Sequence, residues 1–193
     1  MEVSRIRALR GPNLWSRHTA IEAIVTCTAA EQGLSPLHPI EQQLRRIFPE
    51  VGPFDSLRPD QTITMAHALE KVTLGLQTQA GCPISFSRTT PTQEPGVYQV
   101  VVEYSEESVG RQALELAEQL CKAAIAGMGF DLEAAIAQLH ELDEDVRLGP
   151  STGSIVDAAV ARGVPFRRLT EGSLVQLGWG SKQRRIQAAE IDS

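Results

Sequence analysis

The residues best suited to chemistry lie in the segment His67-Ala68-Leu69-Glu70-Lys71. Residues three and four positions apart share one face of an α-helix. An H-x-x-E-H sequence on a helix presents two imidazoles to a zinc ion, with the glutamate between them as general base. Here the last position is Lys71, whose ammonium offers no lone pair and repels a dication. The alternative interpretation, which composition favours, is that His67, Glu70, Lys71 and Leu74 form the polar outer face of a helix.

Two glycine-containing motifs give weaker signals. The segment Gly149-Pro150-Ser151-Thr152-Gly153 matches the G-x-S-x-G nucleophile elbow, which requires a preceding strand and a later histidine. No histidine follows His140, so the segment predicts a helix start capped by a serine or threonine. Gly178-Trp179-Gly180 matches half of a phosphate-binding G-x-G-x-x-G loop and predicts a turn between two strands.

The remaining histidines and the cysteines show no ligand spacing. We expect surface or locally bonded positions for His18, His38 and His140, and core packing for Cys27, Cys82 and Cys121. An odd number of cysteines without a C-x-x-C pair argues against a disulfide scaffold or a zinc ribbon. A reducing compartment, and therefore the cytoplasm, is the expected location.

Hydrophobic periodicity predicts the elements that position these residues. Strands are expected at residues 2–9, 20–27, 83–88 and 96–104, and helices at 40–48, 62–80, 106–125 and 131–142. The helix over 62–80 carries an apolar stripe of Met65, Leu69, Val72 and Leu76. A further helix over 152–162 precedes two strand-like pieces around the Glu171-Gly172 turn, and the tail could add a third strand.

The predicted fold class is α+β. The order β-β-α-α-β-β-α-α fits a mostly antiparallel sheet with helices packed on one face, followed by a short α-β-β segment. The acidic run from Glu141 to Asp145 is expected to end the first unit, with Gly149-Pro150 marking the break, and the last 40 or so residues look like the beginning of another. No apolar run approaches the roughly 20 residues that span a bilayer, so no membrane partner is expected.

The charge is distributed unevenly along the chain. The net charge is −6, which disfavours a nucleic-acid partner. Residues 103–145 hold eleven acidic and two basic side chains, a net of −9, whereas residues 162–185 hold six basic and one acidic side chain, a net of +5. Segments of opposite sign suit a surface that handles ligands of both signs; the alternative is two solvated faces.

Three segments resemble the cyanophycin synthetase family, and they follow one another in the family's order. They are RIRALRGPNLWS at the start, HALEKVTLGLQTQAG with FSRTT and PGVYQVVVEY in the centre, and GPSTGSIVDAAVARGVPFRRLTEGSLVQLGWGSKQRRIQAA at the end. The resemblance implies that residues 1–160 are the polymer-holding N-terminal domain. It also implies that residues 161–193 begin the ATP-grasp region, which is incomplete here.

The resemblance also implies partners and cofactors. The family's enzymes polymerise aspartate and arginine into cyanophycin, a poly-aspartate with arginine on each side chain. They use ATP and Mg²⁺, and the complete enzyme is expected to be a homo-oligomer. The ATP-binding core and the later ligase domains have no counterpart here, so this segment should hold no cofactor, contain no catalytic residues for ligation and be inactive alone. The polymer-contacting residues are not identified by the sequence.

Many members of the family carry H-x-x-E-H-x-x-x-E at this helix, a metallopeptidase-like site that trims the polymer into primers. His67 and Glu70 match the first two positions, whereas Lys71 and Gly75 replace the second histidine and the later glutamate. The resemblance therefore implies a degenerate metal site. Three functions stay open at this point: a polymer-binding module, a zinc peptidase that generates primers, and a structural module that assembles the larger enzyme.

Overall fold

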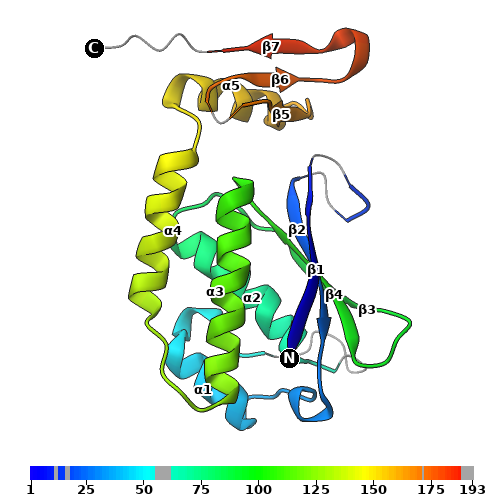
Figure 1. Ribbon diagram of the computed structural model, residues 1–193, viewed down its shortest axis with the longest axis vertical. Coiled ribbons are helices and arrows are strands. Elements are labelled where there is room, and N and C mark those ends of the chain that lie inside the picture. The colour runs from blue at the N-terminus through cyan, green and yellow to red at the C-terminus, as the bar shows by residue number, and fades with distance from the viewer. Residues whose placement is uncertain (11–12, 16–17, 55–61, 171, 188–193) are drawn as a thin grey trace.

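The chain folds into two antiparallel sheets joined by helices, and this confirms the predicted α+β class. The computed structural model describes residues 1–10, 13–15, 18–54, 62–170 and 172–187. The strands of the larger sheet are β1 (Glu2–Leu9), β2 (Ala20–Thr26), β3 (Ser87–Pro91) and β4 (Val97–Glu103), in the order β1-β2-β4-β3. The helices α1 (Pro39–Ile47), α2 (Met65–Gln79), α3 (Glu107–Ile125) and α4 (Leu132–Val146) lie on one side of this sheet (Figure 1).

Alternation along the strands creates the core between this sheet and the helices. Val100 and Val102 of β4 and Ile21 of β2 are buried in one hydrophobic cluster. Helix α2 contributes its predicted stripe of Met65, Leu69, Val72 and Leu76, each with 0% of its surface exposed. The three cysteines Cys27, Cys82 and Cys121 are free thiols in the same cluster, which confirms the prediction that they pack in the core.

A smaller sheet follows the helices. Helix α5 (Pro150–Ala161) leads to β5 (Phe166–Arg168), β6 (Val175–Leu177) and β7 (Arg184–Ile186), which pair antiparallel in the order β5-β6-β7. Short 3-10 turns occupy η1 (Ala29–Glu31), η2 (Pro49–Val51) and η3 (Gly180–Lys182). The Gly178-Trp179-Gly180 segment lies between β6 and β7, as predicted, and β7 supplies the expected third strand. The predicted turn at Glu171 lies outside the described residues, and the unit boundary at residue 160 stays a prediction.

Two predicted boundaries, one of a strand and one of a helix, are wrong. The strand expected at 83–88 begins instead at Ser87, because the carboxylate of Glu103 accepts the N–H groups of Ser85 and Phe86 that a strand partner would otherwise take. Helix α4 continues past Leu142 to Val146, through the acidic run that was expected to end the unit.

Helix starts also differ from the sequence prediction in two places. Helix α2 begins at Met65 rather than Thr62, since Thr64 occupies its N-cap. Helix α5 begins at Pro150 with Gly149 as its N-cap, so the predicted serine or threonine cap is wrong. Proline fits the first turn because its missing N–H has no partner to lose there. Within the described residues, no helix is long and apolar enough to cross a membrane.

Candidate functional site

His67 is buried at the start of α2, so its predicted place on a polar outer face is wrong. Only 9% of its surface is exposed. Its Nδ1 accepts the N–H of Thr64 at 3.2 Å and lies 3.1 Å from the Thr64 hydroxyl. The ring meets that of Tyr98 edge to face, with the ring centroids 6.0 Å apart. His67 therefore occupies the third position of a capping box, where it satisfies a backbone donor that the helix leaves free.

Burial, together with the smaller effect of the Lys71 ammonium, lowers the pKa of His67 from 6.5 to about 4. The imidazole is therefore neutral near pH 7. Since Nδ1 accepts the Thr64 N–H, the single proton of the neutral ring belongs on Nε2. Neither ring nitrogen then has a free lone pair for a metal ion, so the residues present do not fit a zinc ligand set.

The other members of the motif bind separate partners. Glu70 Oε1 accepts a hydrogen bond of 2.7 Å from the Ser87 hydroxyl. Lys71 Nζ donates to the carbonyl of Pro53 at 3.3 Å and lies 4.8 Å from the centre of the Phe54 ring. Within the described residues, no three His, Cys, Asp or Glu side chains are grouped to hold a metal ion.

Gly75 lies at the position where the family that the sequence resembles carries a second glutamate. A Cβ at this position would lie 3.1 Å from both Cε1 and Cζ of Phe48, a ring with 0% of its surface exposed. The glycine therefore admits the Phe48 ring against α2, and a larger side chain there would displace it.

We expect the chain to retain well below one zinc ion per molecule after dialysis against zinc and then buffer. Lys71→His supplies a second imidazole and removes the ammonium, but it leaves the Thr64 cap on His67 in place. We therefore expect only a small gain in retained zinc for this variant, measured by elemental analysis. Stoichiometric zinc in the unmodified chain would contradict this prediction.

A second candidate is a charged cleft between the start of α3 and the smaller sheet. Its volume is about 1010 Å³. Its charged lining comprises four arginines and three acids, namely Arg10, Arg111, Arg167, Arg168, Glu106, Glu107 and Asp145. The acidic and basic segments of the sequence thus meet in one hollow. Opposite charges therefore meet in this cleft and not at the His67 segment.

The charged residues are ordered into two groups. Glu107 lies between two guanidinium groups: Arg10 Nε donates to its Oε2 at 2.8 Å, and Arg111 Nε donates to its Oε1 at 3.0 Å. The hydrogen bond from Arg10 is the largest cause that lowers the pKa of Glu107. Two cations around one anion leave a net charge of +1 at this end of the cleft.

The second group joins the smaller sheet to α3. Arg168 Nη1 lies 3.2 Å from Glu106 Oε1 and also donates to the carbonyl of Val146. Burial raises the pKa of Glu106, and Arg168 opposes this effect. Asp145 lies exposed at the same end of the cleft. The charges of Glu106, Asp145 and Arg168 sum to −1, and Arg167, an exposed residue of β5 that also lines the cleft, brings the sum of this second group to zero.

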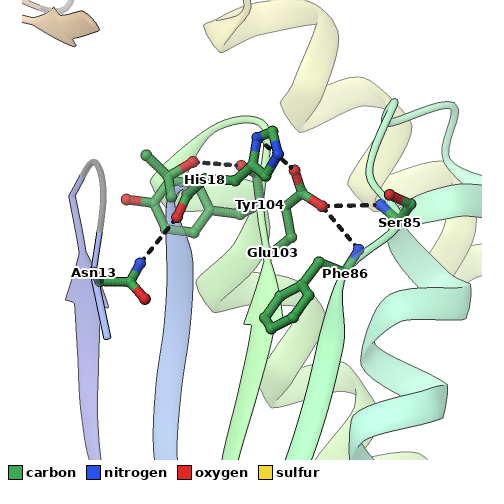
Figure 2. A network of polar contacts seen from close by, with 7 residues as sticks. Asn13, His18, Ser85, Phe86, Glu103 and Tyr104 are labelled. Carbon is green, nitrogen blue, oxygen red and sulfur yellow. Dashed lines mark hydrogen bonds and ion pairs between the residues drawn. The ribbon is translucent and has the colours of Figure 1, made fainter. Parts of the chain in front are cut away.

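A polar network fixes the end of β4, from which the chain enters the cleft (Figure 2). Glu103 Oε2 accepts the N–H groups of Ser85 at 3.0 Å and Phe86 at 2.8 Å. The Thr19 hydroxyl donates to the carbonyl of Tyr104 at 2.8 Å. Burial raises the pKa of Tyr104 to about 12, so its hydroxyl stays neutral in the cleft wall.

The other predicted histidines have local partners. His18 Nδ1 lies 3.4 Å from Glu103 Oε1, and His140 Nδ1 lies 3.7 Å from Glu144 Oε2. His38 caps α1 by accepting a backbone N–H. None of these contacts joins the charged cleft to the His67 segment, so the two candidates are separate sites.

Comparison with known proteins gives one family match and several relatives. The family described as "Cyanophycin synthase-like N-terminal domain" matches residues 48–126. The chain is 36% identical to a cyanophycin synthetase of Trichormus variabilis, over 100% of this chain and 23% of the relative. A cyanophycin synthetase of a Nostoc species gives the same figures, and one of a Synechocystis species is 33% identical over 97% of this chain and 23% of its own. The chain thus spans about a quarter of the length of these relatives.

Proposed function

We propose that this chain, which carries a cyanophycin synthase-like N-terminal domain and resembles the N-terminal region of cyanophycin synthetases, binds the aspartate–arginine polymer in its charged cleft. The observation that supports this proposal is the meeting of four arginines and three acidic residues in one hollow of about 1010 Å³. Each unit of such a polymer carries one free carboxylate and one guanidinium. A cleft that presents both guanidinium groups and carboxylates matches that repeating unit.

The cationic end suits the polymer carboxylates. Arg10 and Arg111 share one acceptor, Glu107, and each guanidinium has five N–H donors. Donors are therefore left over for a ligand, and arginine binds carboxylates with two parallel hydrogen bonds. The anionic end, with Glu106 and Asp145, would receive the polymer guanidinium groups.

This assignment gives the chain a binding role and leaves ligation elsewhere. We propose that the segment anchors the polymer for the other domains of a complete ligase, which would use ATP and Mg²⁺. The primer-generating peptidase is less well supported, because His67 has its Nδ1 engaged by the helix cap and Lys71 stands at the next ligand position. The binding role itself can be tested on this chain alone.

We expect titration of the 193-residue chain with a soluble aspartate–arginine oligomer to give saturable binding that weakens as salt is added. The double substitution Arg10→Gln and Arg111→Gln should lower the affinity by about ten-fold or more, since each lost charge-assisted hydrogen bond is worth about 1.5–3 kcal/mol. Isothermal titration calorimetry measures this effect.

The matched control is Lys122→Gln. Lys122 is on the same helix and pairs with Glu118 at 2.7 Å, but it does not line the cleft. Its substitution should leave the affinity within about two-fold of the original value, as expected for a surface pair. An oligomer that does not bind at millimolar concentration would refute the proposed function, and equal loss in both variants would place binding outside the cleft.

A further inference from the structure

Trp179 is an exposed aromatic side chain at the charged cleft. It is 50% exposed and lines the same hollow as Glu106 and Asp145. Tryptophan carries a large apolar surface, and soluble proteins usually cover most of it. Its exposure in a cleft that also carries carboxylates points to a ligand with both a flat face and a positive charge.

The turn that carries Trp179 is held in place by its backbone. Gly178 and Gly180 have φ angles of 72° and 60°, in the left-handed region that glycine adopts without strain. The N–H of Gly178 donates to the carbonyl of Pro165 at 2.7 Å, which ties the turn to the start of β5. The indole is thus presented from an ordered turn and needs little ordering to bind a ligand.

A guanidinium matches this combination better than an ammonium does. It is planar, weakly hydrated and able to stack on an aromatic face while its edge donates hydrogen bonds to carboxylates. A lysine ammonium is a compact and strongly hydrated charge, and it has no flat face to stack on an indole. The chain already contains one such contact, since the Arg88 guanidinium lies 5.8 Å from the centre of the Trp15 ring.

We propose that Trp179 is the residue by which the charged cleft selects arginine over lysine on the side chains of the polymer. This inference rests on the proposed function, because it requires that the cleft bind the polymer at all. In this arrangement the indole stacks on a side-chain guanidinium, and Glu106 and Asp145 accept its N–H groups.

The experiment uses Trp15→Phe, which leaves Trp179 as the single tryptophan. Intrinsic fluorescence is followed while the chain is titrated with an aspartate–arginine oligomer, with an aspartate–lysine oligomer of equal length, and with L-arginine amide. We expect the arginine oligomer to change the Trp179 emission and to bind about five-fold more tightly than the lysine oligomer. L-Arginine amide should change the emission at much higher concentration.

Calorimetry on Trp179 variants then tests selectivity. Trp179→Leu should weaken binding of the arginine oligomer about five-fold and leave the lysine oligomer nearly unchanged, so that the preference is lost. Trp179→Tyr retains an aromatic face and should retain most of the preference, which separates stacking from damage to the turn. Circular dichroism verifies that both variants are folded.

The possible failures are distinguishable. If neither oligomer binds, the proposed function fails and this inference fails with it. If both oligomers bind equally to the original chain, or if Trp179→Leu retains the preference for arginine, the role of Trp179 is refuted and polymer binding stands. An emission change with L-arginine amide alone would show a site for the free amino acid and would overturn the assignment to the polymer.

Discussion

Lowering the pH from 7 to 4 is expected to reduce the free energy of unfolding by about 3 kcal/mol through His67 alone. The folded chain holds this imidazole neutral with a pKa of about 4, whereas an unfolded chain has the ordinary value of 6.5. As the pH falls below 6.5 the unfolded state binds a proton that the folded state does not. Stability that is fully present above pH 6.5 is therefore lost progressively down to about pH 4.

The pKa of His67 is low because its ring is buried in the first turn of α2. A protonated ring would be buried next to the Lys71 ammonium and the Tyr98 ring. Protonation would also turn Nδ1 into a donor facing the Thr64 N–H, so the capping hydrogen bond would be lost. Both effects act against the charged form.

His67→Gln is the matched variant for this prediction. Glutamine is a preferred residue at the third position of a capping box, so its side-chain oxygen can still accept the Thr64 N–H. It does not titrate between pH 4 and 7. Denaturant unfolding is measured for both proteins at pH 7 and pH 4. The free energy of unfolding should fall by about 3 kcal/mol more in the original chain than in His67→Gln.

Carboxylates titrate in the same pH range, and for this reason the difference between the two proteins is the quantity to measure. Parallel pH profiles would refute the assignment to His67. Nuclear magnetic resonance of the His67 ring protons provides a direct check, because the titration midpoint should lie near 4 rather than 6.5.

The sequence predicted the parts of the fold that depend on local periodicity. The stripe on α2 and the strand that became β4 were identified because each hydrophobic pattern recurs within one element. Ion pairs between residues four positions apart on a helix follow a rule of the same local kind, and Glu107–Arg111 and Glu118–Lys122 lie at 3.0 Å and 2.7 Å. The start of α4 is local in the same sense, because Asp131 directly before it caps the helix, with its Oδ1 accepting the N–H of Ala134 at 3.0 Å.

The candidate site could not be assembled from the sequence. The cleft joins Arg10, Glu106 and Arg168, which come from the end of β1, the start of α3 and β5. Only the unequal charge of two segments indicated that such a surface exists. The burial of His67 was missed because helical periodicity identifies only the face of α2 that packs on the sheet and assigns the opposite face to solvent. Loop residues such as Thr64 and Pro53 cover the face that the pattern assigns to solvent.

Gly110→Ala is expected to destabilise the chain by about 2–3 kcal/mol. An added Cβ would lie 2.6 Å from Cβ of Tyr104 and 3.1 Å from Cγ1 of Ile21. Cβ atoms are fixed to the backbone and cannot rotate away, so α3 would have to move off the sheet. The gain of about 1 kcal/mol in helix propensity from glycine to alanine offsets only part of this cost.

The control is Gly129→Ala, since a Cβ there has no neighbour within 4 Å. Its free energy of unfolding should change by less than about 0.5 kcal/mol. Denaturant unfolding of both variants tests the prediction, and equal stabilities would show that α3 tolerates displacement from the sheet.

Gly110→Ala also connects packing with binding, because α3 begins at Glu107 and carries Arg111 into the cleft. If α3 moves, the spacing between the cationic and anionic groups changes with it, so folded Gly110→Ala should also bind the oligomer more weakly than Gly129→Ala.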